Sequence, residues 1–332
     1  MEEKEKKEDI SKNIAKLMAK KYSSYMQGNA PKLEYVPSGL AGVDWLLGGG
    51  LPCGRIIEMF ADPSVGKTTT AQFFIKQLIE LGYDTALIDA ERTVSEKRLK
   101  DLDLGGNKFH YSRPSSGSQA IEQIIDLANL GVKLIVLDSV PFLVTDEAQE
   151  ADAGQIVMSP QARLLSRVQP KLIPAIEENG CILIFLNQIR SQIGRYGNPN
   201  QSSGGNALKF MCSVRLRLSR LETSSDGSGF SIKFKTEKNK ASGREKQTCV
   251  VDIKHGQGLI AVSSLRELLS DLNLTFNRGS WFFFSDKLCS DLQFETNKIG
   301  QGKPAIDSFL LSDNSIYEKL YNYAVNYVEE VE

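Results

Sequence analysis

Histidine is nearly absent from this chain, which has only His110 and His255 among its 332 residues. Zinc sites are built mainly from histidine and cysteine, and the five cysteines show no C-x-x-C spacing. Their odd number also argues against a framework of disulfide bonds and favours reduced, structural thiols. The sequence therefore argues against a histidine-based zinc site and against a disulfide-stabilised secreted domain.

Long apolar runs and an excess of one charge are also missing. No run could span a bilayer, and the first residues, MEEKEKKEDI, lack the apolar core of a signal peptide. We therefore expect a cytoplasmic protein with no membrane partner. Because 40 Lys and Arg oppose 41 Asp and Glu, for a net charge of −1, bulk charge would not attract nucleic acid. Any such binding would need a local basic stripe and should be salt-sensitive.

The chain does contain a regular alternation of strand and helix patterns. Apolar runs at 55–60, 84–90, 133–139 and 181–188 are typical of buried parallel strands. Helical patterns lie between them, near 67–81, 94–103, 118–130 and 161–178. This alternation predicts an α/β fold, in which helices cover both faces of a mostly parallel sheet. Pro170 and Pro174 predict a kink or a split in the last of these helices.

The two ends of the chain follow other patterns. Residues 10–26 carry a helical apolar stripe that includes Ile10, Ile14 and Leu17, which could pack on its own domain or on a neighbouring subunit. After residue 210 the alternation of apolar and polar residues predicts antiparallel strands. We expect an N-terminal helix and linker at 1–34, a core at 35–262 and a small α+β C-terminal domain at 263–332.

The stretch ADPSVGKT, 61–68, matches the phosphate-loop pattern G-x-x-x-x-G-K-[ST] except that Ala61 replaces the first glycine. It follows a predicted buried strand and opens a predicted helix, as the mechanism requires. Backbone N–H groups of Pro63–Gly66 (Pro63, Ser64, Val65, Gly66; proline itself has none) and of the helix start would form an anion nest. Lys67 would contact the β- and γ-phosphates, and the Thr68 hydroxyl would bind Mg²⁺. Extended backbone at Ala61 would tolerate a Cβ, so we interpret it as a tolerated variant rather than a decayed site.

Three polar residues lie at the ends of other predicted strands: Asp138 and Gln188 end theirs, and Glu91 follows one. Asp138 could hold Mg²⁺ or its waters, Glu91 could orient an attacking water, and the Gln188 amide could contact the γ-phosphate. The alternatives are an ordinary strand-end aspartate for Asp138 and a surface salt bridge for Glu91.

Several longer stretches together resemble the RecA recombinase family. They are PSGLAGVDWLLGGGLPCGRIIEMFADPSVGKTT, LIDAE (87–91), LIVLDSV (134–140), LIFLNQIRSQIG (183–194), GGNALKFMCSVRLRL (204–218), KNK (238–240) and KIGQGK (298–303). The resemblance covers nearly the whole chain, in the order and spacing of the family. It implies a RecA-like P-loop NTPase core, with ATP and Mg²⁺ as cofactors. It also implies an ATP-dependent protein that polymerises on single-stranded DNA and exchanges strands with a homologous duplex.

The resemblance also implies roles for individual residues. Glu91 would be the catalytic carboxylate, and Thr69 would join Lys67 and Thr68 at the phosphates. Lys238 and Lys240 of the KNK motif would reach the nucleotide of the adjacent subunit. Without the resemblance, those lysines would be interpreted as a solvated charge run. Arg98 could stack on the base, and His255 sits where, in the family, an aromatic side chain of the neighbouring subunit approaches the nucleotide.

Two loops would carry the DNA, at about 150–164 and 194–208. In the first, Met158 matches an apolar wedge and Arg163 a phosphate contact, with Ser166 just beyond. The second is introduced by Arg190 and Ile193 and ends in Gly204, Gly205 and Asn206, which could hold the DNA backbone. Alone, Met158 could be a core residue and the glycine-rich loop a linker.

Self-assembly would be head to tail, in an open helical filament. Phe210 matches a family position at the subunit interface, and the stripe of Ile10, Ile14 and Leu17 is a plausible docking surface. Mediator and single-strand-binding proteins are further candidate partners. Two other functions remain open: a hexameric helicase or motor with the same core, and a non-catalytic DNA-binding regulator that holds ATP without hydrolysing it.

Overall fold

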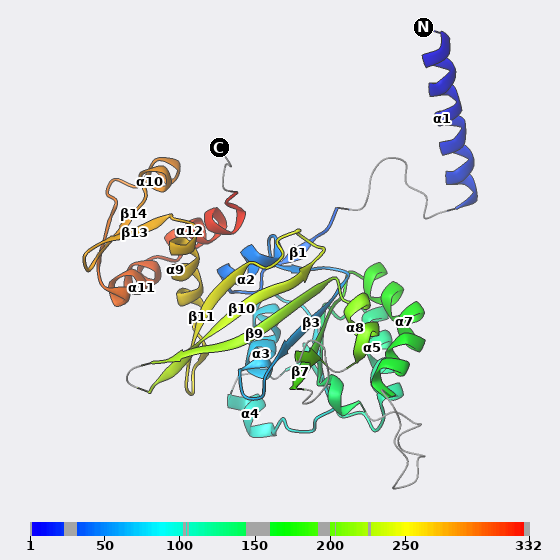
Figure 1. Ribbon diagram of the computed structural model, residues 1–332, viewed down its shortest axis with the longest axis horizontal. Coiled ribbons are helices and arrows are strands. Elements are labelled where there is room, and N and C mark those ends of the chain that lie inside the picture. Colours follow the sequence, from blue (N-terminus) through cyan, green and yellow to red (C-terminus); the bar gives the residue numbers. More distant parts are fainter. Residues whose placement is uncertain are drawn as a thin grey trace. The chain divides into compact units, whose positions relative to one another are not determined.

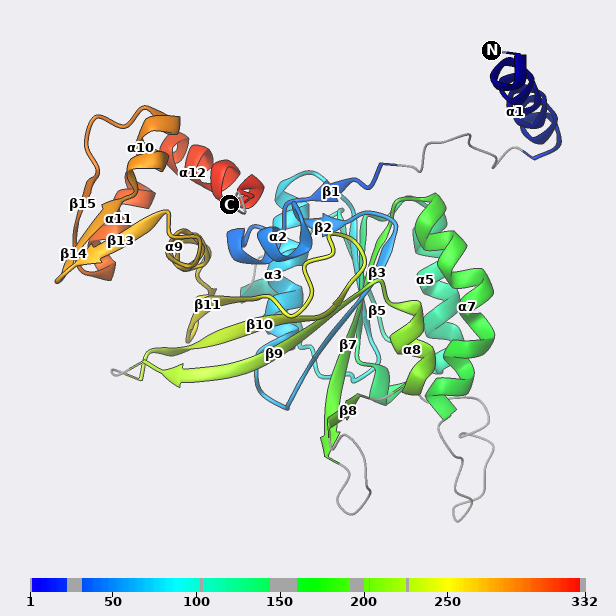
Figure 2. The ribbon, with the colours of Figure 1, turned by 45° about the horizontal axis from the view of Figure 1, so that its top comes forward.

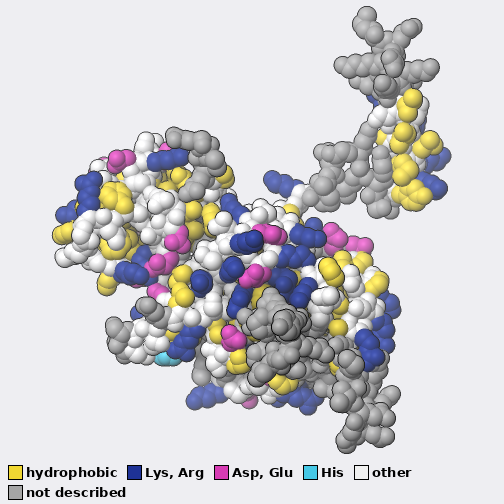
Figure 3. Space-filling model, in the orientation of Figure 1, with side chains coloured by type: hydrophobic (Ala, Val, Ile, Leu, Met, Phe, Trp, Pro, Cys, Tyr) yellow, Lys and Arg dark blue, Asp and Glu magenta, His cyan; other side chains and the backbone are white. Residues whose placement is uncertain are grey.

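The computed structural model describes residues 2–22, 32–101, 104, 106–143, 160–191, 200–202, 204–224 and 227–328. The chain forms two compact units, residues 1–34 and 35–332. The first unit contains helix α1 (Glu2–Lys21). Its predicted apolar stripe is on the surface, where Ile10, Ile14 and Leu17 are 54%, 52% and 68% exposed (Figure 3).

The second unit is built on a large mixed sheet, ten-stranded among the described residues, in the order β12-β11-β10-β9-β3-β7-β6-β4-β5, with β8 paired to β7 (Figure 1). The parallel strands are β3 (Arg55–Ala61), β4 (Thr85–Asp89), β5 (Phe109–Ser112), β6 (Leu134–Asp138), β7 (Ile182–Ser191) and β9 (Val214–Thr223). The antiparallel ones are β8 (Asn200–Ser202), β10 (Gly229–Asn239), β11 (Thr248–Lys254) and β12 (Gly258–Leu259). This confirms the predicted α/β class.

Helices cover both faces of the parallel strands (Figure 2). One core cluster lies under α3 (Lys67–Glu80) and includes Phe74 and Leu78. The other lies under α5 (Gly117–Asn129), α7 (Pro160–Glu178) and α8 (Gly205–Met211) and includes Ile121 and Leu165. Shorter elements complete this part: β1 (Tyr35–Val36), α2 (Ala41–Leu47), β2 (Leu51–Pro52), α4 (Glu96–Asp101) and the 3-10 turn η1 (Val140–Phe142).

Of the two outcomes predicted for the helix at 161–178, the split is wrong, because α7 is one helix from Pro160 to Glu178 with Pro170 and Pro174 inside it, while the kink stays a prediction. Both prolines are exposed. Proline removes one hydrogen bond to the carbonyl four residues earlier. On this face the freed carbonyls can bond to water, so the helix continues while Leu165 and Leu172 stay buried on its other face.

The C-terminal segment has its own core, which includes Leu268, Phe284 and Leu320. Its elements are α9 (Ala261–Asp271), β13 (Thr275–Arg278), β14 (Trp281–Phe284), α10 (Asp286–Leu292), β15 (Lys298–Gln301), α11 (Lys303–Ser312) and α12 (Asn314–Asn326).

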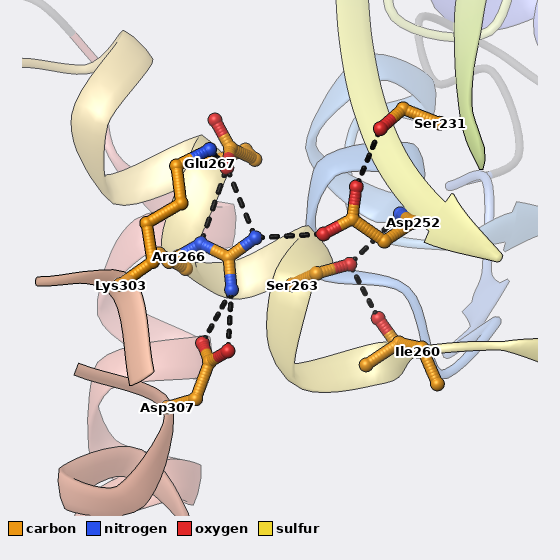
Figure 4. A network of polar contacts seen from close by, with 8 residues as sticks. All are labelled: Ser231, Asp252, Ile260, Ser263, Arg266, Glu267, Lys303 and Asp307. Atoms are coloured by element: carbon orange, nitrogen blue, oxygen red, sulfur yellow. Dashed lines mark hydrogen bonds and ion pairs between the residues drawn. The ribbon is translucent and has the colours of Figure 1, made fainter. Parts of the chain in front are cut away.

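An arginine joins this segment to the large sheet (Figure 4). Arg266 on α9 is 5% exposed, and its guanidinium donates to Asp252 of β11 at 2.8 Å and to both oxygens of Asp307 on α11. Glu267 accepts from Arg266 at 3.1 Å and from Lys303 at 3.0 Å. Paired in this way, a buried guanidinium can hold three elements together.

Helices that could cross a bilayer, being both long and apolar, are absent from the described part of the chain.

Candidate functional site

The site lies at the edge of the sheet where the parallel strands end. The register pairs Ala61 of β3 with Gln188 of β7, and Asp89 of β4 with Asp138 of β6. Residues that follow such strand ends converge on one crevice. A cleft of about 640 Å³ is found there, lined by Pro63, Ser64, Gly66, Lys67, Thr68, Thr69, Glu91, Asp138, Ser139, Gln188, Phe230, Ile253, Lys254, His255, Gly256 and Gly258.

The loop between β3 and α3 supplies one wall. Ala61 is the last residue of the extended strand, and Gly66 has φ +110°, in the left-handed region that favours glycine. Ser64 also has a positive φ, of 60°. Val65 is 6% exposed and packs in the core beneath the loop rather than lining the cleft. Backbone N–H groups at such a turn and helix start are suited to hold an anion.

Lys67 is 8% exposed, and its Nζ donates to the carbonyls of Ala61 at 3.2 Å and Asp62 at 2.9 Å. Burial lowers the pKa of Lys67, while the carboxylates of Asp138 and Glu91 act in the opposite direction. Phosphate oxygens in the cleft could take the place of the two carbonyls and would be stronger partners because they are charged.

Thr68 and Asp138 form an oxygen pair, since the Thr68 hydroxyl donates to Asp138 at 2.8 Å. Asp138 is 2% exposed, and burial raises its pKa to about 6, although the hydrogen bond from Thr68 acts to lower it. Within the described ranges, His, Cys, Asp and Glu side chains form no metal-binding group of three. Mg²⁺ needs fewer protein ligands, because it keeps several waters and binds substrate phosphates through one or two oxygen ligands. Thr68 and Asp138 fit that requirement.

Glu91 lies on the turn after β4. Its N–H donates to the Asp138 carbonyl at 3.0 Å, and the Ser139 hydroxyl donates to its Oε2 at 3.4 Å. The buried Asp89 carboxylate accepts the N–H of Arg92 at 2.7 Å, which fixes the same turn. The half-buried Glu91 carboxylate is thereby held at the cleft beside the phosphate loop, where a general base would act.

Gln188 and His255 line the same cleft. Sequence reasoning missed six further lining residues, namely Ser139, Phe230, Ile253, Lys254, Gly256 and Gly258, most of which come from the antiparallel strands far later in the chain or from the turn that follows them. The ring centres of Phe230 and His255 are 6.0 Å apart. No motif includes Phe230, Ile253 or Lys254, so only the fold reveals that they reach the phosphate loop.

Besides Val65, three predicted nucleotide contacts are not among the lining residues. Lys238 donates from Nζ to the carbonyls of Lys209, at 2.7 Å, and Cys212, at the C-terminal end of α8. Lys240 is exposed. Arg98 is part of α4, and its side chain lies outside the described residues.

The predicted DNA contacts are only partly described. Met158 and Ile193 lie outside the described residues, as does the side chain of Arg190 on β7. Arg163 and Ser166 are exposed on α7, which packs against α8.

Helix α8 carries the remaining predicted residues of this unit. Gly204 is its N-cap with φ +87°, and Gly205 and Asn206 form its first turn. Phe210, the predicted interface residue, is 76% exposed near its other end.

Comparisons with known proteins agree with this arrangement. A family model described as the RecA N-terminal domain matches residues 6–260. Protein RecA of Chloroherpeton thalassium is 36% identical over 296 residues, which cover 87% of this chain and 80% of that protein. Protein RecA of Rickettsia bellii is 35% identical over 327 residues, covering 94% and 92%, and that of Arthrospira platensis is 34% identical over 294 residues, covering 87% and 78%.

Proposed function

Because this chain belongs to the RecA family, we propose that it is an ATP-dependent homologous-recombination protein. It forms helical filaments on single-stranded DNA, pairs that strand with a homologous duplex and catalyses strand exchange. DNA stimulates its ATP hydrolysis. The protein acts in the cytoplasm, with mediator and single-strand-binding proteins as further candidate partners.

The observation that carries this proposal is the composition of the cleft. An anion-binding loop, a buried lysine, a hydroxyl–carboxylate pair and a second carboxylate come from three separate segments of the chain and line one space. Phosphoryl transfer needs these groups for positioning and for electrostatic stabilisation, and little else.

Each group has a distinct task in ATP hydrolysis. The Lys67 ammonium leaves the carbonyls of Ala61 and Asp62 and binds the β- and γ-phosphate oxygens. Thr68 and Asp138 hold Mg²⁺, which when bound neutralises charge on the phosphates. An opposing cation also offsets the burial of the Asp138 carboxylate.

Glu91 acts on the attacking water. Its carboxylate accepts a water proton in line with the γ-phosphate, and the Ser139 hydroxyl helps to hold it in place. Gln188 contacts the γ-phosphate from the point where β7 leaves β3 and relays its presence toward the second DNA loop.

The neighbouring protomer completes the site. Lys238 and Lys240 bring positive charge to the phosphates of the adjacent subunit, so that assembly and ATP binding form one linked equilibrium. The exposed Phe210 and the stripe of Ile10, Ile14 and Leu17 form subunit contacts. Met158, Arg163, Ser166, Arg190, Ile193, Gly204, Gly205 and Asn206 contact the DNA.

The test is ATP hydrolysis with and without single-stranded DNA in the wild type and in Glu91→Gln. We expect Glu91→Gln to lower DNA-stimulated turnover by about 10²–10⁴-fold, the usual contribution of a positioned base, while DNA binding survives. The matched control is Glu96→Gln, since that side chain is 81% exposed and pairs only with Lys100 among the ion pairs of the described residues. It should leave turnover unchanged.

Electron microscopy with single-stranded DNA and a non-hydrolysable ATP analogue completes the test. Helical filaments are expected. Ring-shaped hexamers would instead indicate a helicase, and DNA binding without any ATP hydrolysis in the wild type would indicate a non-catalytic regulator.

A further inference from the structure

A carboxylate lies inside the apolar centre of the sheet. Strand β3 lies between β9 and β7 in the sheet (Figure 2). Glu58 is in the middle of β3, and its side chain is fully buried. A buried charge is costly unless it is paired and hydrogen-bonded. The cleft is lined from Pro63 onward and does not include Glu58, so none of the tasks assigned above uses this carboxylate.

The partners of Glu58 come from the two adjacent strands. Arg215 lies directly opposite it in the β3–β9 register and donates from Nε to Glu58 Oε2. Asn187 of β7, also fully buried, donates from Nδ2 to Glu58 Oε1 at 2.9 Å. The three side chains therefore form a polar line across three neighbouring strands, on the face that α7 and α8 cover.

This line ends at Gln188. The Asn187 side-chain oxygen accepts the backbone N–H of Gln188 at 2.9 Å. The Asn187 amide can face this way because its NH₂ group is taken by Glu58, and Glu58 is oriented by Arg215. At Gln188 the strand leaves β3, where Ala61 is its last partner, and continues toward β8 from Ile189. The conformation of the backbone at this point decides where the Gln188 amide lies in the cleft.

We propose that Arg215, Glu58 and Asn187 are positioning residues for Gln188, holding its backbone so that its side chain meets the γ-phosphate. This inference rests on the proposed function, because it assigns a support to a group of that ATP site. The other end of the line lies beside Lys238, which is opposite Arg215 in the β9–β10 register. The line therefore connects the residue that contacts the protomer's own nucleotide with the strand that carries a cation for the neighbour's.

A purely stabilising role would not require this arrangement. Apolar residues of similar volume often replace a buried ion pair without loss of stability. A hydrogen-bonded line has a further property, since each member fixes the orientation of the next. If positioning is the role, its loss should act through Gln188 and should not add to the loss of Gln188 itself.

The experiment is a double-mutant cycle on the full chain with Asn187→Ala, Gln188→Ala and the double variant. The readouts are DNA-stimulated ATP turnover, the KM for ATP and the thermal midpoint. We expect Asn187→Ala to lower DNA-stimulated turnover at least about fivefold, with the KM for ATP within about twofold. The double variant should match Gln188→Ala. Arg215→Lys, which keeps the charge but changes the donor geometry, should give a smaller loss of the same kind.

The matched control is Thr85→Val, which removes a buried hydroxyl at the opposite end of β4, far from the cleft edge. It should lower the thermal midpoint without changing DNA stimulation. Multiplicative losses in the double variant would overturn the inference, as would a turnover loss in Asn187→Ala no larger than in Thr85→Val. If Asn187→Ala does not fold, Arg215→Lys combined with Gln188→Ala gives the same comparison. A wild type without DNA-stimulated hydrolysis would instead overturn the proposed function, and this inference with it.

Discussion

Ala61 and Gly66 stand at the two ends of the phosphate loop and have different backbone conformations. Ala61 is extended and still paired with Gln188 in the sheet, so a Cβ fits there. Gly66 has φ +110°, and a Cβ on it would lie 2.8 Å from the Cδ1 of Ile232 and 3.2 Å from that of Ile253. The departure from the phosphate-loop pattern is therefore at the position where the structure tolerates it.

Gly66→Ala should accordingly abolish measurable ATP binding or weaken it by at least about 100-fold, because strain and the clash with Ile232 distort the anion nest. Ala61→Gly restores the consensus residue and should change the Kd for ATP by less than about twofold. Binding of a fluorescent ATP analogue measures both. A marked gain in affinity from Ala61→Gly would contradict our interpretation of Ala61 as a tolerated variant.

The sequence could predict which residues line the site where they belong to a motif of known chemistry or stand at the end of a strand. The loop residues and Glu91 follow a strand, Asp138 ends β6 and Gln188 is the last residue of β7 paired with β3, and the strands bring them to one cleft. Their catalytic roles remain predictions. Residues whose contribution depends on strand neighbours were not predictable, although Glu58 gave a signal as a lone charge in the apolar run RIIEMFA.

At the scale of elements, helix α8 and strand β10 are joined through Lys238. The ammonium donates to the carbonyls of Lys209 and Cys212, which the helix itself leaves unpaired at its end. Burial lowers the pKa of Lys238, with the nearby Lys240 acting in the same direction. Lys240 is exposed, so the two lysines of the KNK motif have different surroundings in a single protomer.

Lys238→Gln should therefore destabilise the unassembled protein by about 1.5–3 kcal/mol, the usual net value of hydrogen bonds that involve a charged group. Lys240→Gln should change the free energy of unfolding by less than about 0.5 kcal/mol, as at an ordinary surface position. Denaturant unfolding without DNA or nucleotide measures both. Equal effects of the two substitutions would show that Lys238 does not cap α8.

Periodicity predicted the elements that have a regular apolar pattern. The four apolar runs are parallel strands, as expected, and the antiparallel strands follow them. Edge strand β5 was missed because its sequence, FHYS, is polar and only partly buried. The split in α7 was wrong because propensity cannot tell whether a proline falls on a buried or an exposed face.

At the scale of the whole second unit, Asp44 joins the large sheet's helix α2 to the C-terminal segment. Its buried carboxylate accepts the N–H of Ser38 at 2.9 Å and the hydroxyl of Tyr321 on α12. Burial raises the pKa of Asp44 to about 6, although the hydrogen bonds from Ser38 and Tyr321 act to lower it. The folded protein therefore holds a proton at this site over a pH range in which the unfolded chain has lost it.

The sign of the pH effect follows from this difference. Between about pH 4 and 6 the folded state binds more protons at Asp44 than the unfolded state, so its contribution to stability falls as pH rises. The free energy of unfolding of Asp44→Asn minus that of the wild type should therefore increase by roughly 2–3 kcal/mol from pH 4 to pH 7. Guanidinium titrations at both pH values measure it, and a difference that stays constant with pH would refute the assignment.

The carbonyls that hold Lys238 have one more consequence if the proposed function is correct. The ammonium cannot cap α8 and reach a neighbour's phosphates at the same time. An isolated protomer would then hydrolyse little ATP. Total hydrolysis would depend on how many protomers have joined end to end rather than on how many the cell contains.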